Sequence, residues 1–478
     1  MDNPERTLNI GGPLVTDLSR FLGPTQLSID PTLLARHSYD ALGEYRASLG
    51  RSPESGSPDV IVYPDSTEQV SEILSFASSR GIPVIPYGGG TGVMGGVVPV
   101  NGGIMLNMQR MKRVVEINRE SGYFRVEAGA ILEDISAILD SMGLLFGHDP
   151  WSRPIATVGG AISTNGVGYL AGTYGNMGEQ VIGLQVVLSN GDVLAEKLVS
   201  GIAGPNLANL FIGSEGTLGI ITRATVRAYP KPEAESLAAY SFPNFETGFH
   251  AIQELFSFGL TPSVVDYAEE RDPALTDGEK AKIILYLGFH GVKDEVDEHT
   301  KTAGGLCKRF GGVSLPKRVA IEFWKTRHQS AHRYKRHMEL HGYQPQPTGA
   351  SRYMDYLHVA IPSARVLEYR EFCKKLLDSK LITVREWSLW GRQEYFSLLI
   401  QDSRAGNGES PPYLAAIVNE ILITAQDMGG SMEYCHGIGY RLNHLVQREM
   451  GTGGINALRS IKRALDPSLI LNPGKLDL

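Results

Sequence analysis

The chain has 478 residues, more than a single hydrophobic core usually organises, so we expect two or three domains. A hydrophobic content of 42% is ordinary for a globular protein, and a net charge of −7 argues against nucleic acid as the main partner. The three cysteines lie far apart in the sequence, which excludes a disulfide framework and a cysteine-only metal or iron–sulfur site within the chain: Cys307, Cys373 and Cys435.

The first residues carry neither a basic segment nor an apolar one, so we expect no secretory signal. No apolar stretch approaches the roughly 18 residues that a membrane-spanning helix needs. Together with the cysteine usage, this predicts a cytoplasmic protein without an integral membrane segment. Peripheral attachment to a membrane is left open.

Residues 1–57 are expected to form an N-terminal extension that ends in a turn-rich linker. Residues 60–63 then predict a strand, and Ser66 or Thr67 is a suitable cap for the helix that follows. A second apolar run at 82–85 predicts another strand. Strand, helix and strand within about 30 residues form a βαβ unit, whose ligand-binding edge is the carboxyl end of its strands.

A glycine-rich loop follows the second strand, with six glycines in the eleven residues from Pro86 to Gly96. Such a loop brings backbone N–H groups close to an anion. It is not a P-loop, because no Gly-Lys-Ser/Thr follows, and the extended chain after it does not fit the dinucleotide fingerprint. We interpret it as a phosphate cradle, with a plain surface loop as the alternative.

Two further glycine clusters follow, at 148–178 and 213–222, separated by alternating apolar runs at 104–130 and a predicted helix at 131–142. Asn190-Gly191 lies between two apolar runs and predicts a β-hairpin. Three glycine clusters interleaved with strands favour one extended ligand held between two small α/β lobes. A dinucleotide such as FAD has that shape.

Residues 233–430 are richer in helices, charge and tryptophan, and they predict an α+β second domain. Strands are expected near 283–287, 353–361 and 395–400, and helices near 244–257 and 364–379. The apolar spacing at 457–465 predicts a helix near the C-terminus.

Four spaced motifs resemble the FAD-linked oxidases of the vanillyl-alcohol-oxidase/p-cresol-methylhydroxylase (PCMH) type: residues 86–92, 157–160, 174–176 and 211–222. Residues 436–439 and 466–475 are similar to the branch that holds D-lactate dehydrogenases, glycolate oxidase subunits and alkylglycerone-phosphate synthases. The resemblance implies an α+β fold with a two-lobed PCMH-type FAD-binding domain at 58–232 and an α+β cap, or substrate, domain at 233–430. It also implies a C-terminal segment, 431–478, that returns to the flavin site.

The resemblance implies where FAD would bind. The first glycine loop would hold the pyrophosphate, the second cluster would line the flavin, and the third would lie along the rest of the cofactor: Pro86, Tyr87, Gly88, Gly89, Gly90, Thr91 and Gly92; Pro150, Thr157, Gly160, Ser163, Thr164 and Tyr174; Glu215, Gly219 and Ile221. Relatives that bind flavin covalently carry a histidine at or before the loop. Tyr87 stands there in this chain, so we expect FAD to be bound non-covalently.

His436 is the candidate catalytic residue, because an imidazole can take a proton from a substrate hydroxyl or stabilise negative charge on reduced flavin. The alternative is a structural histidine. Arg385 and Tyr395 are the candidates from the cap, by resemblance to the synthases, chosen over Arg327, Arg352 and Arg392. Relatives with a divalent metal have Glu immediately before the histidine and a His-rich strand motif. Cys435 takes the first position and the second motif is absent, so we expect no metal.

These features predict an FAD-dependent oxidoreductase that oxidises a small 2-hydroxy acid, of the D-lactate or glycolate type, by hydride transfer to flavin N5. Electrons would pass to a separate acceptor: a quinone, a cytochrome or an iron–sulfur partner. Two alternatives stay open, a flavin-dependent transferase of the alkylglycerone-phosphate synthase type and a non-catalytic FAD-binding subunit. Whether the chain forms a homodimer is also left open.

Overall fold

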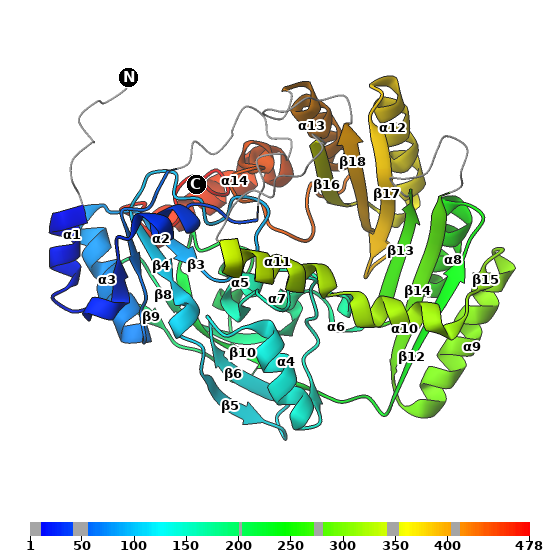
Figure 1. The fold of residues 1–478 in the computed structure, drawn as a ribbon, viewed down its shortest axis with the longest axis horizontal. Coiled ribbons are helices and arrows are strands. Elements are labelled where there is room, and N and C mark those ends of the chain that lie inside the picture. The colour runs from blue at the N-terminus through cyan, green and yellow to red at the C-terminus, as the bar shows by residue number, and fades with distance from the viewer. Residues whose placement is uncertain (1–10, 42–55, 200–202, 272–280, 342–352, 403–411) are drawn as a thin grey trace.

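The computed structural model describes residues 11–41, 56–199, 203–271, 281–341, 353–402 and 412–478. The other residues, among them most of the predicted linker and Arg352, lie outside the described part. Two small sheets lie side by side, and a seven-stranded sheet faces them (Figure 1). Within the described residues, no helix is long and apolar enough to cross a membrane.

The first lobe is a four-stranded sheet in the order β1-β2-β4-β3, in which β2, β4 and β3 run parallel. Its elements are α1 (Gly11–Leu18), β1 (Leu27–Ser28), α2 (Pro31–Arg36), β2 (Val60–Val62), α3 (Thr67–Arg80), β3 (Val84–Tyr87) and β4 (Ile104–Asn107). The Ser66 hydroxyl caps α3 by accepting the Gln69 N–H at 3.3 Å. The predicted βαβ unit is confirmed, with β4 placed between its two strands, and the first glycine loop leaves the carboxyl end of β3.

The second lobe is an antiparallel five-stranded sheet in the order β5-β6-β10-β8-β9. Its elements are β5 (Val114–Asn118), β6 (Tyr123–Glu127), α4 (Leu132–Ser141), α5 (Val158–Ser163), α6 (Ala171–Tyr174), α7 (Met177–Gln180), β8 (Val181–Val187), β9 (Val193–Leu194) and β10 (Ile220–Arg227). The predicted hairpin is confirmed: β8 pairs with β9, and Gly191 takes a φ of +90° in the turn. A two-stranded sheet joins β7 (Leu144–Leu145) to β11 (Tyr229–Pro230).

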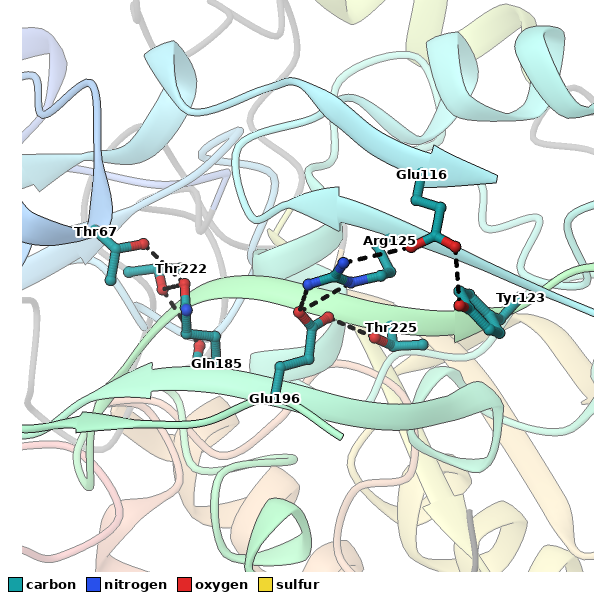
Figure 2. A network of polar contacts seen from close by, with 8 residues as sticks. All are labelled: Thr67, Glu116, Tyr123, Arg125, Gln185, Glu196, Thr222 and Thr225. Carbon is teal, nitrogen blue, oxygen red and sulfur yellow. Dashed lines mark hydrogen bonds and ion pairs between the residues drawn. The ribbon is translucent and has the colours of Figure 1, made fainter. Parts of the chain in front are cut away.

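One amide side chain joins the two lobes. The Gln185 Oε1 atom on β8 accepts the Thr67 hydroxyl from the start of α3 at 2.8 Å and the Thr222 hydroxyl from β10 at 3.1 Å (Figure 2). Thr222 is fully buried and Thr67 nearly so. Losing this acceptor would leave the Thr67 hydroxyl without its partner and the Thr222 hydroxyl with only the Gln185 carbonyl at 3.4 Å. The contact fixes the first lobe against the sheet of the second.

A charged network continues along the same sheet (Figure 2). The Arg125 guanidinium on β6 donates to Glu196 at 2.9 Å and to Glu116 on β5 at 3.4 Å. Glu196 also accepts the Thr225 hydroxyl from β10, and Glu116 accepts the Tyr123 hydroxyl at 2.9 Å. The chain that follows β9 is thereby attached to three strands of the sheet.

The seven-stranded sheet belongs to the second half of the chain, in the order β15-β12-β14-β13-β17-β18-β16. Its strands are β12 (Ala234–Ser241), β13 (Val264–Glu270), β14 (Lys282–Gly291), β15 (Val313–Ser314), β16 (Tyr353–Ala360), β17 (Thr383–Trp390) and β18 (Tyr395–Asp402). The helices α8 (Phe245–Ser257), α9 (Lys293–Arg309), α12 (Val366–Ser379) and α13 (Pro412–Asp427) pack on one face, and the other face turns toward the two lobes (Figure 1). Four of the strands were not predicted from the sequence: β12, β13 and β17, in which charged and aromatic residues obscure the apolar alternation, and β15, which has only two residues.

Two helices run from this sheet toward the lobes, α10 (Lys317–Thr326) and α11 (Gln329–His341) (Figure 1). The Asp149 carboxylate, in the second glycine cluster, anchors them through Arg327 at 2.8 Å and His328 at 3.0 Å. Burial raises the pKa of Asp149, but the hydrogen bond from His328 and the Arg327 charge outweigh it and lower the pKa to about 2. Asp149 therefore stays ionised and holds the helices in place.

The C-terminal segment returns to the two lobes. Helix α14 (Val446–Leu465), kinked at Gly451 and longer than the predicted helix, packs Leu458, Ile461 and Leu465 against the second lobe. Lys462 lies on the buried side of this helix. Its ammonium group donates to the Thr217 carbonyl at 2.7 Å, the Leu471 carbonyl at 2.8 Å and the Asp466 carboxylate at 2.6 Å. One cation thus ties the third glycine cluster to the end of the chain.

We predict that Lys462→Met lowers the free energy of unfolding by about 3–5 kcal/mol, because it leaves the buried Asp466 carboxylate without its counter-charge and two carbonyls without this donor. Urea denaturation followed by circular dichroism measures the change. The control is Lys301→Met, which removes an exposed ion pair with Glu298 and should cost less than about 1 kcal/mol. Equal losses in both variants would contradict the role of Lys462.

Candidate active site

A cavity of about 530 Å³ lies where the two lobes, the cap sheet and the C-terminal segment meet. All three glycine clusters and the loop that carries His436 contribute to its wall. Of the residues expected to bind FAD, fifteen line it: Pro86, Tyr87, Gly88, Gly89, Gly90, Thr91, Gly92, Pro150, Thr157, Gly160, Ser163, Thr164, Glu215, Gly219 and Ile221. Segments more than 300 residues apart in the chain therefore enclose one space.

The first glycine loop presents free backbone donors to this cavity. The N–H groups of residues 89–92 donate to no other group in the described part of the chain. Unpaired amides are rare in proteins unless solvent or a ligand satisfies them. Successive N–H groups at a cavity wall fit a phosphate or pyrophosphate, as the sequence analysis expected of this loop.

The glycines are also required by the neighbouring chain. A Cβ atom on Gly88 would lie 2.4 Å from the Thr157 hydroxyl oxygen, and one on Gly89 would lie 2.3 Å from the Ile155 carbonyl oxygen. Gly90 takes a φ of +65°, with the Tyr87 hydroxyl directly beneath it. The loop is thus pressed against the second glycine cluster, which brings two of the three clusters together on one side of the cavity.

Tyr174 lies elsewhere. Its ring packs against Tyr229 with centroids 4.6 Å apart, its hydroxyl lies 3.2 Å from Nδ1 of His290, and it is not part of the cavity wall. The residues that follow it, at the start of α7, bring the chain back toward the cap.

Glu215 connects the third glycine cluster to the loop that carries His436. Its Oε1 atom accepts the N–H groups of Ile438 at 2.6 Å and Gly439 at 2.9 Å, across more than 220 residues of sequence. Burial raises the pKa of Glu215 to about 7, although these N–H groups and Lys475 act in the opposite direction. The sequence analysis expected Glu215 to contact the cofactor. The structure gives its carboxylate a second role, which is to hold the C-terminal loop at the cavity.

His436 reaches the cavity from that loop. Its Nδ1 atom lies 3.5 Å from the Glu433 carboxylate, whose side chain is 3% exposed. Burial lowers the pKa of His436, whereas Cys435 and Glu433 raise it, and the balance is a pKa of about 10. The imidazole is therefore charged at neutral pH, which suits the stabilisation of an anion rather than the removal of a proton.

A chain of polar groups extends from His436 across the cap sheet. The His358 ring on β16 meets the His436 ring edge to face with centroids 4.5 Å apart. His358 Nδ1 lies 2.8 Å from the Ser397 hydroxyl on β18, which lies 2.8 Å from the Tyr434 hydroxyl. All four side chains line the cavity. The arrangement can hold and pass a proton at the cavity wall.

Two acidic residues, Glu386 on β17 and Asp266 on β13, lie on the same sheet face. Tyr356 on β16 donates its hydroxyl to the Glu386 carboxylate on β17 and lies 3.2 Å from the Ser388 hydroxyl. Asp266 on β13 also lines the cavity. Burial, and then the Glu386 and Glu270 charges, raise the pKa of Asp266 to about 8. Sequence analysis missed these residues, although polar side chains at every second position of β16 and β17 mark one polar face of a strand.

The residues expected from the cap lie behind the wall. The Tyr395 ring stacks on Tyr434 with centroids 4.3 Å apart, and its hydroxyl donates to Asn176 at 3.3 Å. Arg385 is the extra residue of an irregularity in β17, and neither it nor Tyr395 is part of the cavity wall.

Two other arginines considered as substrate ligands are engaged outside the cavity. Arg327 pairs with Asp149, and Arg392 pairs with Glu179 at 2.7 Å. In the described residues, no three His, Cys, Asp or Glu side chains come together as a metal site would require.

The geometry defines a class of protein, one with an anion-binding glycine loop and a substrate cavity under a cap sheet. Family comparison agrees: residues 58–195 match the FAD binding domain family, and residues 231–476 match the family of FAD linked oxidases, C-terminal domain. The chain belongs to the FAD-linked oxidases, and FAD is its cofactor. The free N–H groups at the cavity wall fit that cofactor.

Similar curated proteins have different activities. The chain is 28% identical to the glycolate oxidase subunit GlcD of Bacillus subtilis over 455 residues, 92% of this chain and 91% of that one. It is 29% identical to a probable mitochondrial D-lactate dehydrogenase of Danio rerio over 435 residues, 88% and 84% of the two chains. It is 27% identical to the alkyldihydroxyacetonephosphate synthase of Trypanosoma brucei brucei over 504 residues, 97% and 80% of the two chains.

The fold is that of the PCMH type. A solved structure of p-cresol methylhydroxylase with substrate bound superposes with a TM-score of 0.73 at 18% identity, covering 98% of this chain and 96% of that one. The predicted family and the predicted two-lobed FAD-binding fold with an α+β cap are therefore confirmed.

Gly89→Ala is predicted to weaken FAD binding at least tenfold, because its Cβ has to displace the Ile155 backbone. Titration of the FAD-free protein with FAD measures the dissociation constant. Gly305→Ala is the matched control: this α9 glycine has open space around it, so the change should leave binding unaltered. Unchanged affinity in Gly89→Ala would contradict the place of the loop in the FAD site.

Glu433→Gln is predicted to lower the pKa of His436 below its value of about 10, because the variant keeps an acceptor oxygen but loses the negative charge, while the effect of Cys435 remains. The wild-type imidazole stays protonated up to about pH 10, and the variant loses its proton at a lower pH. A pH titration of the His436 ring resonance by NMR measures both values. Exposed Glu420→Gln should change neither, and equal pKa values in wild type and Glu433→Gln would refute the assignment.

Proposed function

We propose that this FAD-linked oxidase oxidises the hydroxyl-bearing carbon of a small 2-hydroxy acid, of the glycolate or D-lactate type. One observation supports the proposal above others: free loop amides, a charged imidazole and a hydrogen-bonded second imidazole converge on one cavity. The glycolate oxidase subunit and D-lactate dehydrogenase among its relatives are consistent with this substrate class.

In the proposed reaction, the substrate C–H and O–H bonds break and a C=O bond forms. Bound FAD supplies the acceptor for the hydride at flavin N5. The His436 imidazolium attracts the substrate carboxylate and the developing negative charge on the hydroxyl oxygen. Because His436 is already protonated, we assign the hydroxyl proton to His358, which Ser397 and Tyr434 orient.

Further parts of the proposal come from the sequence. FAD is held non-covalently, with Tyr87 beneath the glycine loop. Electrons leave for a separate acceptor: a quinone, a cytochrome or an iron–sulfur protein. The protein is cytoplasmic, and its domains are bounded at 58–232, 233–430 and 431–478. Arg385 and Tyr395 act by positioning the wall residues in front of them, since neither lines the cavity.

A flavin-dependent transferase reaction without net oxidation is the second candidate. The observation that favours it is the match to the trypanosomal synthase, which covers 97% of this chain. In that case the same cavity would hold an acylated dihydroxyacetone phosphate.

Anaerobic mixing with D-lactate or glycolate tests the proposal, and we expect the flavin absorbance near 450 nm to bleach. His436→Gln should slow the bleaching by a factor of about 10² or more, because it removes the charge that stabilises the oxyanion. Acid precipitation should release FAD into the supernatant, as expected of a non-covalent cofactor. No bleaching with any hydroxy acid, together with turnover of an acylated dihydroxyacetone phosphate, would replace the oxidase proposal with the transferase.

A further inference from the structure

The cavity-facing side of the cap sheet carries polar residues in an ordered row. Ser388 on β17 lies directly opposite Ser397 on β18, and Ser397 lies directly opposite His358 on β16. The row ends in two imidazoles, His358 and His436, on one side. On the other side it ends in Glu386 on β17 and Asp266 on β13, which we call the acidic end. Tyr356, whose ring centroid lies 4.3 Å from that of His358, reaches across β18 to donate to Glu386.

Within the described part of the chain, one hydrogen bond reaches the carboxyl groups of the acidic end. Glu386 accepts the Tyr356 hydroxyl, and the Asp266 side chain accepts none. Two aromatic residues form the neighbouring wall, Tyr169 and Trp390, whose rings meet edge to face with centroids 5.1 Å apart. Carboxylates beside aromatic rings and away from bulk water are costly unless a ligand supplies hydrogen bonds or positive charge.

The two ends of the row therefore differ in what they attract. The charged imidazole at one end favours an anion, and the acidic end repels a carboxylate and favours a donor. A hydroxy acid lying along the row would place its carboxylate and reacting hydroxyl near His436 and its remaining chain toward Asp266 and Glu386.

We propose that the acidic end binds a hydrogen-bond-donating group on the substrate, a hydroxyl or an ammonium, beyond the hydroxyl that is oxidised. This inference rests on the proposed oxidation of a hydroxy acid and narrows its substrate class. The preferred substrates are 2-hydroxy acids with a distal hydroxyl or ammonium group. Acids with an alkyl end are poorer substrates, and those with a second carboxylate are the poorest.

A matched series of four-carbon acids tests the inference on the FAD-loaded protein. The probes differ only at C4: 2-hydroxybutanoate, 2,4-dihydroxybutanoate, 4-amino-2-hydroxybutanoate and malate. We expect kcat/KM for at least one of the two donor-bearing acids to exceed that for 2-hydroxybutanoate tenfold or more, and malate to be the poorest. The hydroxyl and ammonium probes distinguish the two kinds of donor. Equal kcat/KM across the series would overturn the inference.

Asp266→Asn and Glu386→Gln are the two informative variants, since each replaces an ionisable carboxyl group by an amide with little change in volume. Each should reduce the preference for the ammonium probe over 2-hydroxybutanoate about tenfold and improve malate. Glu235→Gln removes an exposed charge from β12 of the same sheet and should leave the order unchanged. Flavin content and melting temperature show that each variant is folded. If neither Asp266→Asn nor Glu386→Gln changes the ratios of kcat/KM among the four acids, the role of the acidic end is refuted.

Binding separates this inference from the proposed function. Acids that lack the 2-hydroxyl group are titrated against the holoenzyme, and binding is followed by the shift of the flavin spectrum. The four probes are butanoate, 4-hydroxybutanoate, 4-aminobutanoate and succinate. Tighter binding of the donor-bearing acids, lost in Asp266→Asn, supports the acidic end even if no hydroxy acid reduces the flavin. Equal affinity for all four acids, or no binding by any of them, contradicts the role of the acidic end even if a hydroxy acid is oxidised.

Discussion

The site depends on the buried Glu215 carboxylate, which holds a loop near the C-terminus against the third glycine cluster. The bonds from Ile438 and Gly439 fix the backbone that follows His436. The N–H group of Tyr434, which donates to the His358 carbonyl at 3.1 Å, fixes the backbone before it. Two other polar side chains close the same junction. Asn472 donates to the carbonyls of Gly96 at 2.9 Å and Glu215 at 2.7 Å, and Lys475 donates to the Val98 carbonyl at 2.8 Å. The C-terminal segment is thus a structural part of the FAD site.

This junction also explains the unusual charges around the cavity. Burial lowers the pKa of Lys475 to about 8, although the Glu215 and Asp40 charges act to raise it. Burial raises the pKa of Glu215 to about 7. In both groups burial favours the neutral form and outweighs the opposing charges and, for Glu215, the backbone donors. His436, whose pKa is raised by Cys435 and Glu433, then supplies positive charge to a cavity whose cap wall also carries carboxyl groups. A substrate bound there meets a cation at one point and hydrogen-bond acceptors at another.

The sequence predicted the cofactor end of the molecule well and the substrate end poorly, for a physical reason. Backbone that approaches a ligand or another segment needs glycine, so the loop at Pro86 and the cluster around Thr157 are visible as local motifs. The cap has no such requirement. Its cavity wall is made of single side chains on β13, β16, β17 and β18, and their meeting depends on strand register that no local pattern fixes. Arg385 and Tyr395 were expected there from the resemblance to the synthases, which does not fix the strand register. Asp266, Glu386 and His358 were not predicted, because no local motif distinguishes them.

The most direct test of this account is the affinity of the Glu215→Gln variant for FAD. The variant keeps the side-chain volume but replaces one acceptor oxygen with an amide that faces the N–H groups of Ile438 and Gly439. Titration of the FAD-free variant should give a dissociation constant at least tenfold weaker than that of the wild type, a loss of about 1.4 kcal/mol or more. A variant that binds FAD as tightly as the wild type would contradict the claim that this carboxylate assembles the site.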